Sequence, residues 1–393
     1  MAGTFWTDCR VAIGAVIASN GIAAVAYGLL QPVLTIRMER AGHSALVIGV
    51  VASAWALGIV AGSPFYARII RRFGTRPSLV LGLLAAGVLM LLFTTTGHVA
   101  VWALLQCVQG LAFGHFWVLS ESLINTLVDP KARGRVAALY VTVLGLGAAL
   151  GPLLMNSVGT TGALPFVLCA ALLWMGSAPL LLVRLPALTS QESASPRFRS
   201  IVSTFPGLIA IGLAAGFADH GPQGLLPPFA LTMGATVHAV SLMLFALACG
   251  RALFVLPIGM LADRHPVDWV LAGCAAGTAL LVGGIYLLWS HAAIVLALWF
   301  ALGALLDAFY ALGMALIGHR VQTQDLASAN TAFVVLHSLG GFAGAALLGG
   351  AMDGWGPIGY PIVVAAVSLA LTVLVWPRRV GGDADLTHMP MGD

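Results

Sequence analysis

Long apolar runs, separated by short polar or charged breaks, make up most of this chain. Each run has roughly the 20 apolar residues that a helix needs to cross a bilayer core of about 30 Å. The runs are too long for barrel strands, and a helix satisfies its own backbone in lipid. The pattern therefore predicts an all-α membrane protein with twelve transmembrane helices, near residues 11–36, 44–66, 78–96, 99–127, 135–157, 162–183, 204–232, 236–260, 268–290, 292–318, 328–352 and 357–376.

The composition agrees with a membrane location. Hydrophobic residues make up 60% of the chain and charged residues only 8%, whereas about a quarter of a soluble domain is charged. Arg10 before an apolar run resembles the start of a secretory signal peptide. That run continues from Val11 to Ile36, which is long enough to span, so we expect it to be retained as the first helix.

A polar stretch between the sixth and seventh predicted helices divides the chain into two halves. Lys and Arg collect on the cytoplasmic side of membrane proteins, so their positions predict the orientation. Of the 18, all except Arg37, Arg40 and Arg251 lie on the side of the two termini. This segregation predicts a multi-pass protein of a bacterial inner membrane with both termini cytoplasmic. The expected organisation is an N-terminal six-helix bundle (1–183), a cytoplasmic linker (184–203), a C-terminal six-helix bundle (204–376) and a cytoplasmic tail (377–393).

The sequence lacks the motifs of several other function classes. It has no phosphate loop, no H-E-x-x-H and no hydrolase elbow, so we expect neither an enzyme nor direct ATP drive. No basic cluster is interleaved with aromatic residues, which argues against a nucleic-acid partner. The five cysteines are widely spaced in apolar runs, which is typical of packing residues. No metal or cofactor is expected.

The two halves repeat one another at an offset near 193 residues. Two related bundles imply a cavity at their pseudo-symmetric interface, and this architecture suits alternating access. The matched positions are Gly110 with Gly303, Phe116-Trp117 with Phe309-Tyr310, Gly147-x-x-x-Gly151 with Gly340-x-x-x-Gly344, and Gly28-Leu-Leu-Gln-Pro32 with Gly224-Leu-Leu-Pro-Pro228.

A family resemblance begins at the end of the eighth predicted helix. The segment Gly259-Met-Leu-Ala-Asp263-Arg264 resembles the G-x-x-x-D-R signature of the major facilitator superfamily. Its counterpart after the second helix has Arg71 where the family has Asp. The resemblance extends over essentially the whole chain and implies that fold, with two six-helix bundles. It also implies a conformational latch formed by Asp263, Arg264, Arg72 and Arg76.

Two further stretches resemble family motifs. Gly147-Ala-Ala-Leu-Gly151-Pro152 is similar to a motif of proton-driven exporters, although its closing glycines are missing; the alternative is a face of close helix packing. Gln106 stands where the family has an Arg that is often tied to proton coupling. The segment Ser120-Glu121-Ser122 and the basic loop that follows are similar to the YcaD-like branch.

Glu121 is the first candidate for proton coupling. A charge at membrane depth costs roughly 2.5–3.5 kcal/mol on insertion scales, so it needs a reason. Trp117, Glu121 and Asn125 recur at helical spacing and form one polar stripe, which we expect to line the cavity. A carboxyl in an apolar cavity can bind and release a proton near neutral pH. The alternative is a structural carboxyl that is hydrogen-bonded to a neighbouring helix or loop.

Asp219, Arg251 and Asp307 form a second candidate group for protons or substrate. An unpaired buried charge is strongly disfavoured, so Arg251 is expected to pair with one Asp and leave the other for a proton or a cationic substrate. A purely structural ion pair is the alternative.

Three aromatic or imidazole side chains complete the candidate site. His115 and His337 are candidates for substrate or proton handling, with hydrogen-bonded packing as the alternative. Tyr310 matches Trp117 in the repeat and is expected to line the cavity.

These observations predict a secondary active transporter that exports a small organic solute against protons. Its expected partners are the solute, protons and the lipid bilayer, and we expect it to function as a monomer. Uptake by proton symport and a non-transporting sensor on the same fold are the alternatives, because the fold and the carboxyls do not fix the direction of transport.

Overall fold

The computed structural model describes residues 2–128, 132–186, 206–320 and 326–376. Over these residues the chain is almost entirely helical. The elements are α1 (Ala2–Arg40), α2 (Ala45–Phe73), α3 (Thr75–Leu92), α4 (Val99–Leu127), α5 (Arg133–Val158), α6 (Leu164–Leu181), α8 (Pro206–Thr232), α9 (Val237–Ala262), α10 (Val267–Leu287), α11 (Ala292–Arg320), α12 (Leu326–Trp355), the short η1 (Gly356–Ile358) and α13 (Gly359–Val375).

Among the described residues, ten segments are long and apolar enough to cross a membrane. One of them, Ala332–Val375, contains both α13 and most of α12. The helix outside all ten is α8, because the polar residues Asp219, His220 and Gln223 lie at its centre. The predicted all-α membrane fold is confirmed. The predicted linker and tail lie almost entirely outside the described residues.

The end of α2 differs from its prediction. The apolar run stops near Tyr66, but the helix continues to Phe73, so the arginines there lie on a helix rather than in a loop. The hydropathy pattern predicts only the part of a helix that lies in lipid. An exposed helix can continue beyond the end of the apolar run. Only Gly74 separates α2 from α3, and its φ of 82° lies in the left-handed region that favours glycine.

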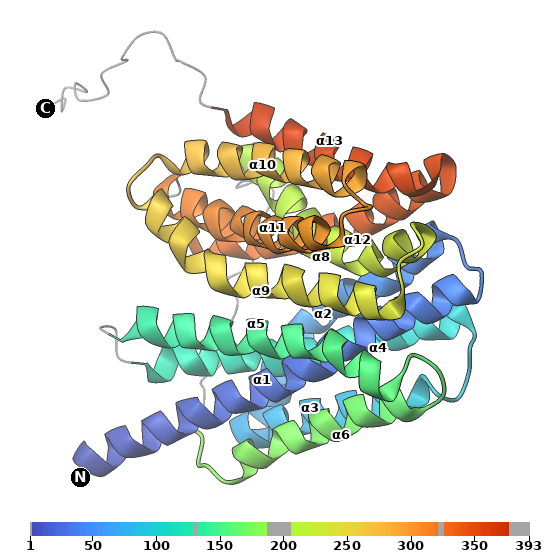
Figure 1. Cartoon of the computed structure of the whole chain (residues 1–393). Helices are drawn as coiled ribbons and strands as arrows, with labels where there is room; N and C mark the ends of the chain where they lie inside the picture. Colours follow the sequence, from blue (N-terminus) through green and yellow to red (C-terminus); the bar gives the residue numbers. More distant parts are fainter. Residues whose placement is uncertain (1, 129–131, 187–205, 321–325, 377–393) are drawn as a thin grey trace, which may run out of the picture.

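The helices form two bundles with the same internal arrangement (Figure 1). The N-terminal bundle, blue to green, lies in the lower half of the view, and the C-terminal bundle, yellow to red, lies in the upper half. In the first bundle α1 packs on α5 and α6, α2 on α4, and α3 on α4 and α6. In the second, α8 packs on α12 and α13, α9 on α11, and α10 on α11 and α13. The bundles meet mainly where α2 contacts α12 and α5 contacts α9.

Glycines allow equivalent helix crossings in both bundles. Gly110 of α4 packs directly against the carbonyl group of Trp55, and Gly303 of α11 packs in the same way against Leu247. A Cβ at either glycine would collide with that backbone. The pairs correspond at offsets of 193 and 192 residues, so the repeat seen in the sequence is a repeat of helix packing.

The glycine contacts also correct one of the pairs of positions that were matched between the two halves of the sequence. Gly28 of α1 lies against Ala148, whereas the equivalent contact in the second bundle joins His220 of α8 to Gly341. Gly28 therefore corresponds to His220, one helical turn before the Gly224 matched in the sequence. Gly-Leu-Leu is a common tripeptide in so apolar a chain, which explains the mistaken alignment.

The loops define two faces of the molecule. One face carries the start of α1, the end of α13 and the connections α2–α3 and α9–α10, where Arg72, Arg76 and Arg264 lie. We call it the arginine-rich face, and it is at the left in Figure 1. The other, opposite face carries the connections α1–α2, α5–α6 and α10–α11 and the end of α12.

Candidate functional site

An ion pair between α8 and α9 lies at the centre of the C-terminal bundle. Arg251 Nη1 is 2.5 Å from Asp219 Oδ1, and Arg251 Nη2 donates to the backbone carbonyls of Ala218 and Asp219 at 3.0 and 3.1 Å. The Ala218 carbonyl would normally accept from the residue four positions later, but that residue is Pro222, which has no N–H. A proline therefore frees the carbonyl that Arg251 binds.

Two histidines share the other oxygen of the same carboxylate. His337 Nε2 of α12 lies 3.5 Å from Asp219 Oδ2, and His220 Nδ1 lies 3.6 Å from it. The two imidazole rings are 5.3 Å apart. The indole of Trp55 on α2 lies 5.2 Å from the His220 ring, so the N-terminal bundle contacts this cluster directly.

Asp307 on α11 faces the cluster but is not paired within it. Its carboxyl interacts electrostatically with Arg251, Asp219 and His337. Among the described residues, no ion pair within 4.0 Å and no hydrogen bond reaches the Asp307 side chain. Arg251 is thus committed to Asp219, as the sequence predicted for one of the two acids, and Asp307 is the carboxyl left over.

Glu121 lies on the other bundle, near the arginine-rich end of α4. Its side chain is exposed and interacts electrostatically with Trp117 and with Tyr140 of α5. It also interacts with Tyr310 of α11, across the interface between the bundles. The indole N–H of Trp117 is buried without a hydrogen-bond partner in the described structure, so it lies near the Glu121 carboxyl without bonding to it.

Tyr310 connects the two groups of acids. Its ring is 39% exposed and lies 5.1 Å from the His337 ring, at a steep angle. It interacts electrostatically with Glu121, Asp219 and Asp307. Tyr310 therefore interacts with acids of both bundles.

The structure does not bring His115 into this group. Its ring is buried, with 4% of the residue exposed, and it lies 5.2 Å from Tyr66 on the α2 side of α4. Neither ring nitrogen has a hydrogen-bond partner among the described residues. The side chain of Asn125, which was predicted beside Glu121, is outside the described part of the structure.

The predicted latch residues do not contact one another. Asp263 and Arg264 follow α9 with exposed side chains, and among the described residues neither has an ion pair. Arg72 lies over the ring of its neighbour Phe73 at 5.8 Å. Arg76 donates to the carbonyl of Leu181, so it joins α3 to α6 within one bundle.

The predicted packing motif of α5 lies against α1. Gly147 contacts the backbone of Gly21, and Gly151 contacts the backbone of Gly28, at distances that leave no room for a side chain. Pro152 follows within the same helix.

The N-terminal bundle contains hydrogen bonds between amide and tyrosine side chains that were not predicted from the sequence. Gln106, whose residue is fully buried, donates to Gln31 of α1 at 3.2 Å, and Tyr140 donates to Asn20 at 3.3 Å. The contact of Asp353 with two backbone N–H groups of α2 was not predicted either. The available signal was the presence of amides within apolar runs, since a buried amide needs a hydrogen-bond partner.

The group Asp219, His220 and His337 could in principle hold a metal ion, because their ligand atoms lie within 4.8 Å of one another. Its chemistry fits a cation poorly. The guanidinium of Arg251 already binds the carboxylate, and Nδ1 of His220 lies 3.2 Å from the Gly216 carbonyl, to which it donates when it carries a proton. The arrangement is better suited to holding protons than to holding a metal.

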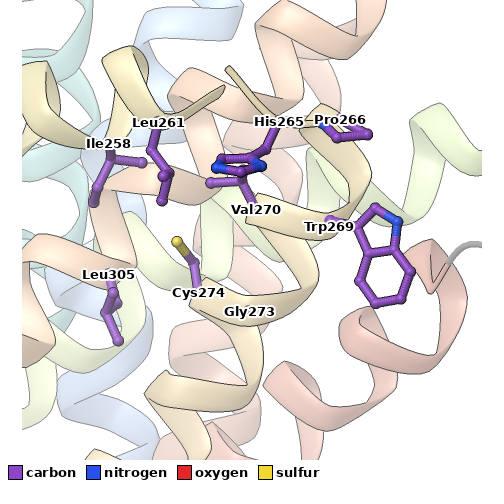
Figure 2. Close-up of a pocket in the computed structure, with 9 residues that line it drawn as sticks. All are labelled: Ile258, Leu261, His265, Pro266, Trp269, Val270, Gly273, Cys274 and Leu305. Carbon is purple, nitrogen blue, oxygen red and sulfur yellow. The ribbon is translucent and has the colours of Figure 1, made fainter. Parts of the chain in front are cut away.

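A separate apolar pocket lies away from these acids, near the arginine-rich end of α9 (Figure 2). Its volume is about 650 Å³, and none of the candidate acids lines it. It is therefore not part of the site. The lining residues are Ile258, Leu261, His265, Pro266, Trp269, Val270, Gly273, Cys274 and Leu305.

Two repeated bundles of membrane-crossing helices, with an ion pair inside one bundle, fit a transporter rather than an enzyme, and the comparisons with known proteins agree. A family model described as Major Facilitator Superfamily matches residues 16–229 and, a second time, 208–387. Together these matches cover nearly the whole chain, and the protein belongs to the major facilitator superfamily.

Named relatives agree with this assignment. The uncharacterised transporter YfkF of Bacillus subtilis (strain 168) is 28% identical over 250 residues, which are 62% of this chain and 64% of that protein. The uncharacterised transporter YcaD of Escherichia coli is 26% identical over 370 residues, which are 92% of this chain and 94% of that protein. The resemblance to the YcaD-like branch is thus confirmed.

Solved structures confirm the fold. A point mutant of the nucleoside transporter NupG superposes with a TM-score of 0.79 at 12% identity, covering 93% of this chain and 99% of that one. The NupG structure without that mutation superposes with a TM-score of 0.74 at 12% identity, covering 93% and 97%.

Proposed function

We propose that this transporter exports a small organic solute in exchange for protons, by alternating access, as a single chain. In this proposal the arginine-rich face is cytoplasmic and the membrane is the inner membrane of a bacterium, as the placement of Lys and Arg favours. The resemblance of Gly147, Gly151 and Pro152 to an exporter motif supports the direction.

The observation that carries the proposal is the difference between Asp219 and Asp307. Asp219 holds Arg251 at 2.5 Å and has two histidines nearby, so its negative charge is compensated. Asp307 lies in the middle of α11 without such a partner among the described residues. An uncompensated carboxyl in a poorly hydrated site gains stability by taking up a proton. Asp307 is therefore our proton carrier.

Glu121 has a second role in the proposal. It lies on the N-terminal bundle with an exposed side chain and interacts electrostatically with Tyr310 of the other bundle. In an exchange mechanism the solute and the proton must compete for the same state of the protein. Acids on both bundles allow one acid to bind the proton and the other to contact the solute. We propose that Glu121 contributes to the solute site and that its affinity depends on protonation of Asp307.

The test uses inside-out membrane vesicles with an acidic interior and a dye that reports the pH gradient. A panel of amphipathic and weakly charged compounds, with nucleosides included because NupG transports them, would be added to wild type, Asp307→Asn and Asp307→Glu. We expect at least one compound to dissipate the gradient with wild type and with the Glu variant. The Asn variant, which cannot carry a proton on this side chain, should give no response.

Each other outcome points elsewhere. A response that persists in Asp307→Asn would remove Asp307 from the proton path and leave Glu121 as the carrier. Compounds that accumulate in the cell with protons, tested in whole cells, would indicate uptake by symport. A compound that binds, measured by thermal shift, but never moves would indicate a sensor on this fold.

A further inference from the structure

Two seams join the bundles toward the opposite face. In the first, α2 and α12 pack without intervening side chains: Gly49 contacts the backbone of Ala345, and Gly349 contacts the backbone of Ala45. In the second, α5 meets α9, where Asn156 Nδ2 donates to Ser241 Oγ at 3.0 Å. Both seams must open if this face is ever to admit a solute.

The first seam carries a charge. The carboxylate of Asp353 on α12 accepts the backbone N–H of Ala45 at 2.7 Å and that of Leu46 at 3.0 Å. These are first-turn N–H groups of α2, which have no partner within their own helix. An anion at a helix N-terminus is also favoured by the helix dipole. One side chain of the C-terminal bundle thus caps a helix of the N-terminal bundle, 308 residues away in sequence.

The position of Asp353 is not explained by its own helix. It lies in the last turn of α12, which ends at Trp355, and an acid there opposes the negative end of the helix dipole. Ser44 already caps α2 locally by accepting from Val47. The Asp353 carboxylate is unfavourable for its own helix, α12, and α2 already has a cap at Ser44. The stabilisation that Asp353 provides therefore comes from the contact between the two bundles.

No matching contact is found at the arginine-rich face among the described residues. Asp263 and Arg264, the corresponding candidates there, are exposed and have no ion pair with a described residue. In the part of the chain that the structure describes, the charged contact between the bundles therefore lies at the opposite face. Such a contact would hold that face closed.

We infer that Asp353 is a positioning residue of the transport cycle: its carboxylate holds the opposite face closed by capping α2, and the two hydrogen bonds break each time that face opens. The inference rests on alternating access but not on the coupling ion, the solute or the direction. The free energy of such an exposed contact is small, so the lock is weak enough to open in every cycle.

The test measures distances between spin labels on the opposite face. Labels at Ala41→Cys, in the α1–α2 connection, and Ser290→Cys, between α10 and α11, report the two bundles in a variant whose five native cysteines are replaced. We expect Asp353→Ala to raise the ratio of the long, open distance to the short one by about twofold to tenfold. Asp353→Asn keeps one acceptor oxygen and should give a smaller rise.

Two further variants separate gating from misfolding. Ala45→Pro removes the N–H that donates to Oδ1, yet proline suits the first position of a helix and Ser44 is already extended, so α2 should stay intact. It should open the gate, but less than Asp353→Ala does, because the Leu46 N–H still donates to Asp353. Glu39→Gln is the control: it is a neighbouring acid that interacts with Asp353 only electrostatically and removes a repulsion, so the gate should stay closed or close further.

The outcomes decide the inference without reference to transport. Unchanged distances in both Asp353→Ala and Ala45→Pro, with normal folded yield, would overturn it and reduce Asp353 to a helix cap. The same opening in Glu39→Gln as in Asp353→Ala would also overturn it, because general charge loss on this face would then be the cause. Failure to find a proton-coupled solute would leave these distances unaffected.

Discussion

In the N-terminal bundle Ile59 of α2 lies against Gly114 of α4. In the C-terminal bundle the equivalent positions, fixed by the glycine crossings, are Arg251 of α9 and Asp307 of α11. Where α1 has Tyr27, α8 has Asp219, the acid that binds Arg251 at 2.5 Å. The backbones cross alike in both bundles, but the side chains at the centre are neutral in one and ionisable in the other.

In the N-terminal bundle, amide side chains make the interior hydrogen bonds. Gln106 binds Gln31, Tyr140 binds Asn20, and Gln109 donates to the Ala86 carbonyl at 3.3 Å. Such bonds do not change between pH 5 and pH 8, because amides do not titrate. Carboxyls and imidazoles do respond. The two bundles therefore differ in chemistry and not in packing: the ion pair and Asp307 belong to the C-terminal bundle, whereas the N-terminal bundle has the buried His115 and Glu121, which interacts with Tyr310.

The largest expected effect follows from removing the cation of the ionisable bundle. Arg251→Met leaves Asp219 without its strongest partner and should reduce the free energy of unfolding by about 2 kcal/mol or more, less than for a fully buried pair because Asp219 is 37% exposed. Denaturation in SDS would measure it. Adding Asp219→Leu should restore part of that stability without restoring transport. If the double variant is no more stable than Arg251→Met, the pair is not what holds α8 to α9.

The second largest effect on stability is expected for substitutions at the glycines where helices cross. These substitutions test whether the two bundles pack alike. Gly110→Ala and Gly303→Ala each force a Cβ against a carbonyl, and each should cost about 1–3 kcal/mol of stability. The control is Gly273→Ala in α10, where a Cβ meets nothing within 4 Å; it should be neutral or slightly stabilising. Clearly unequal costs at Gly110 and Gly303, measured by thermal unfolding in detergent, would break the comparison.

A smaller effect is expected at Pro222, which has no equivalent role in α1. Pro222→Ala returns a backbone N–H that competes with Arg251 for the Ala218 carbonyl, now bound at 3.0 Å. We expect the Arg251 contact to weaken by about 1 kcal/mol, the net worth of one hydrogen bond. A double-mutant cycle with Arg251→Met would measure the coupling. Additive effects of the two changes would show that proline does not prepare this carbonyl.

The smallest effect on stability is expected at Asp307, the residue that we propose as the proton carrier. Asp307→Asn removes no hydrogen bond or ion pair of the described structure, so the free energy of unfolding should change by less than about 0.5 kcal/mol. Proton movement should nevertheless be lost in the vesicle assay. A strong loss of stability in SDS denaturation would instead identify Asp307 as a structural partner of Arg251, and the two acids would then exchange roles.

Much of the fold could be predicted from the chain alone. Each helix of α1–α6 and α8–α13 overlaps a predicted one, because long apolar runs have no alternative conformation in lipid. The end of α2 could not be predicted, since hydropathy does not report a helix that continues to Phe73 outside the membrane. The register of α1 against α8 was also wrong by one turn, because Gly-Leu-Leu carries too little information in an apolar sequence.

The candidate site was predicted in part. Asp219, Arg251, Asp307 and His337 were named from their membrane depth, and they do lie together. His115 was named by the same argument but faces α2 instead, since one sequence does not say which way a helix turns its side chains. His220 and Tyr140 were given no role, because their importance comes from their neighbours.

The lipid surroundings, the positions of the helices in the described residues, the twofold repeat and the ionisable residues at membrane depth could all be predicted from the sequence. These depend on composition and on periodicity along one chain. Three features follow from contacts between helices: Arg251 binds Asp219, Pro222 frees a carbonyl for Arg251, and Asp353 binds α2 across 308 residues. These contacts depend on distances of a few ångströms between helices that are far apart in sequence. The free energy of a hydrogen bond or ion pair at such distances depends on its geometry as well as on the residue types.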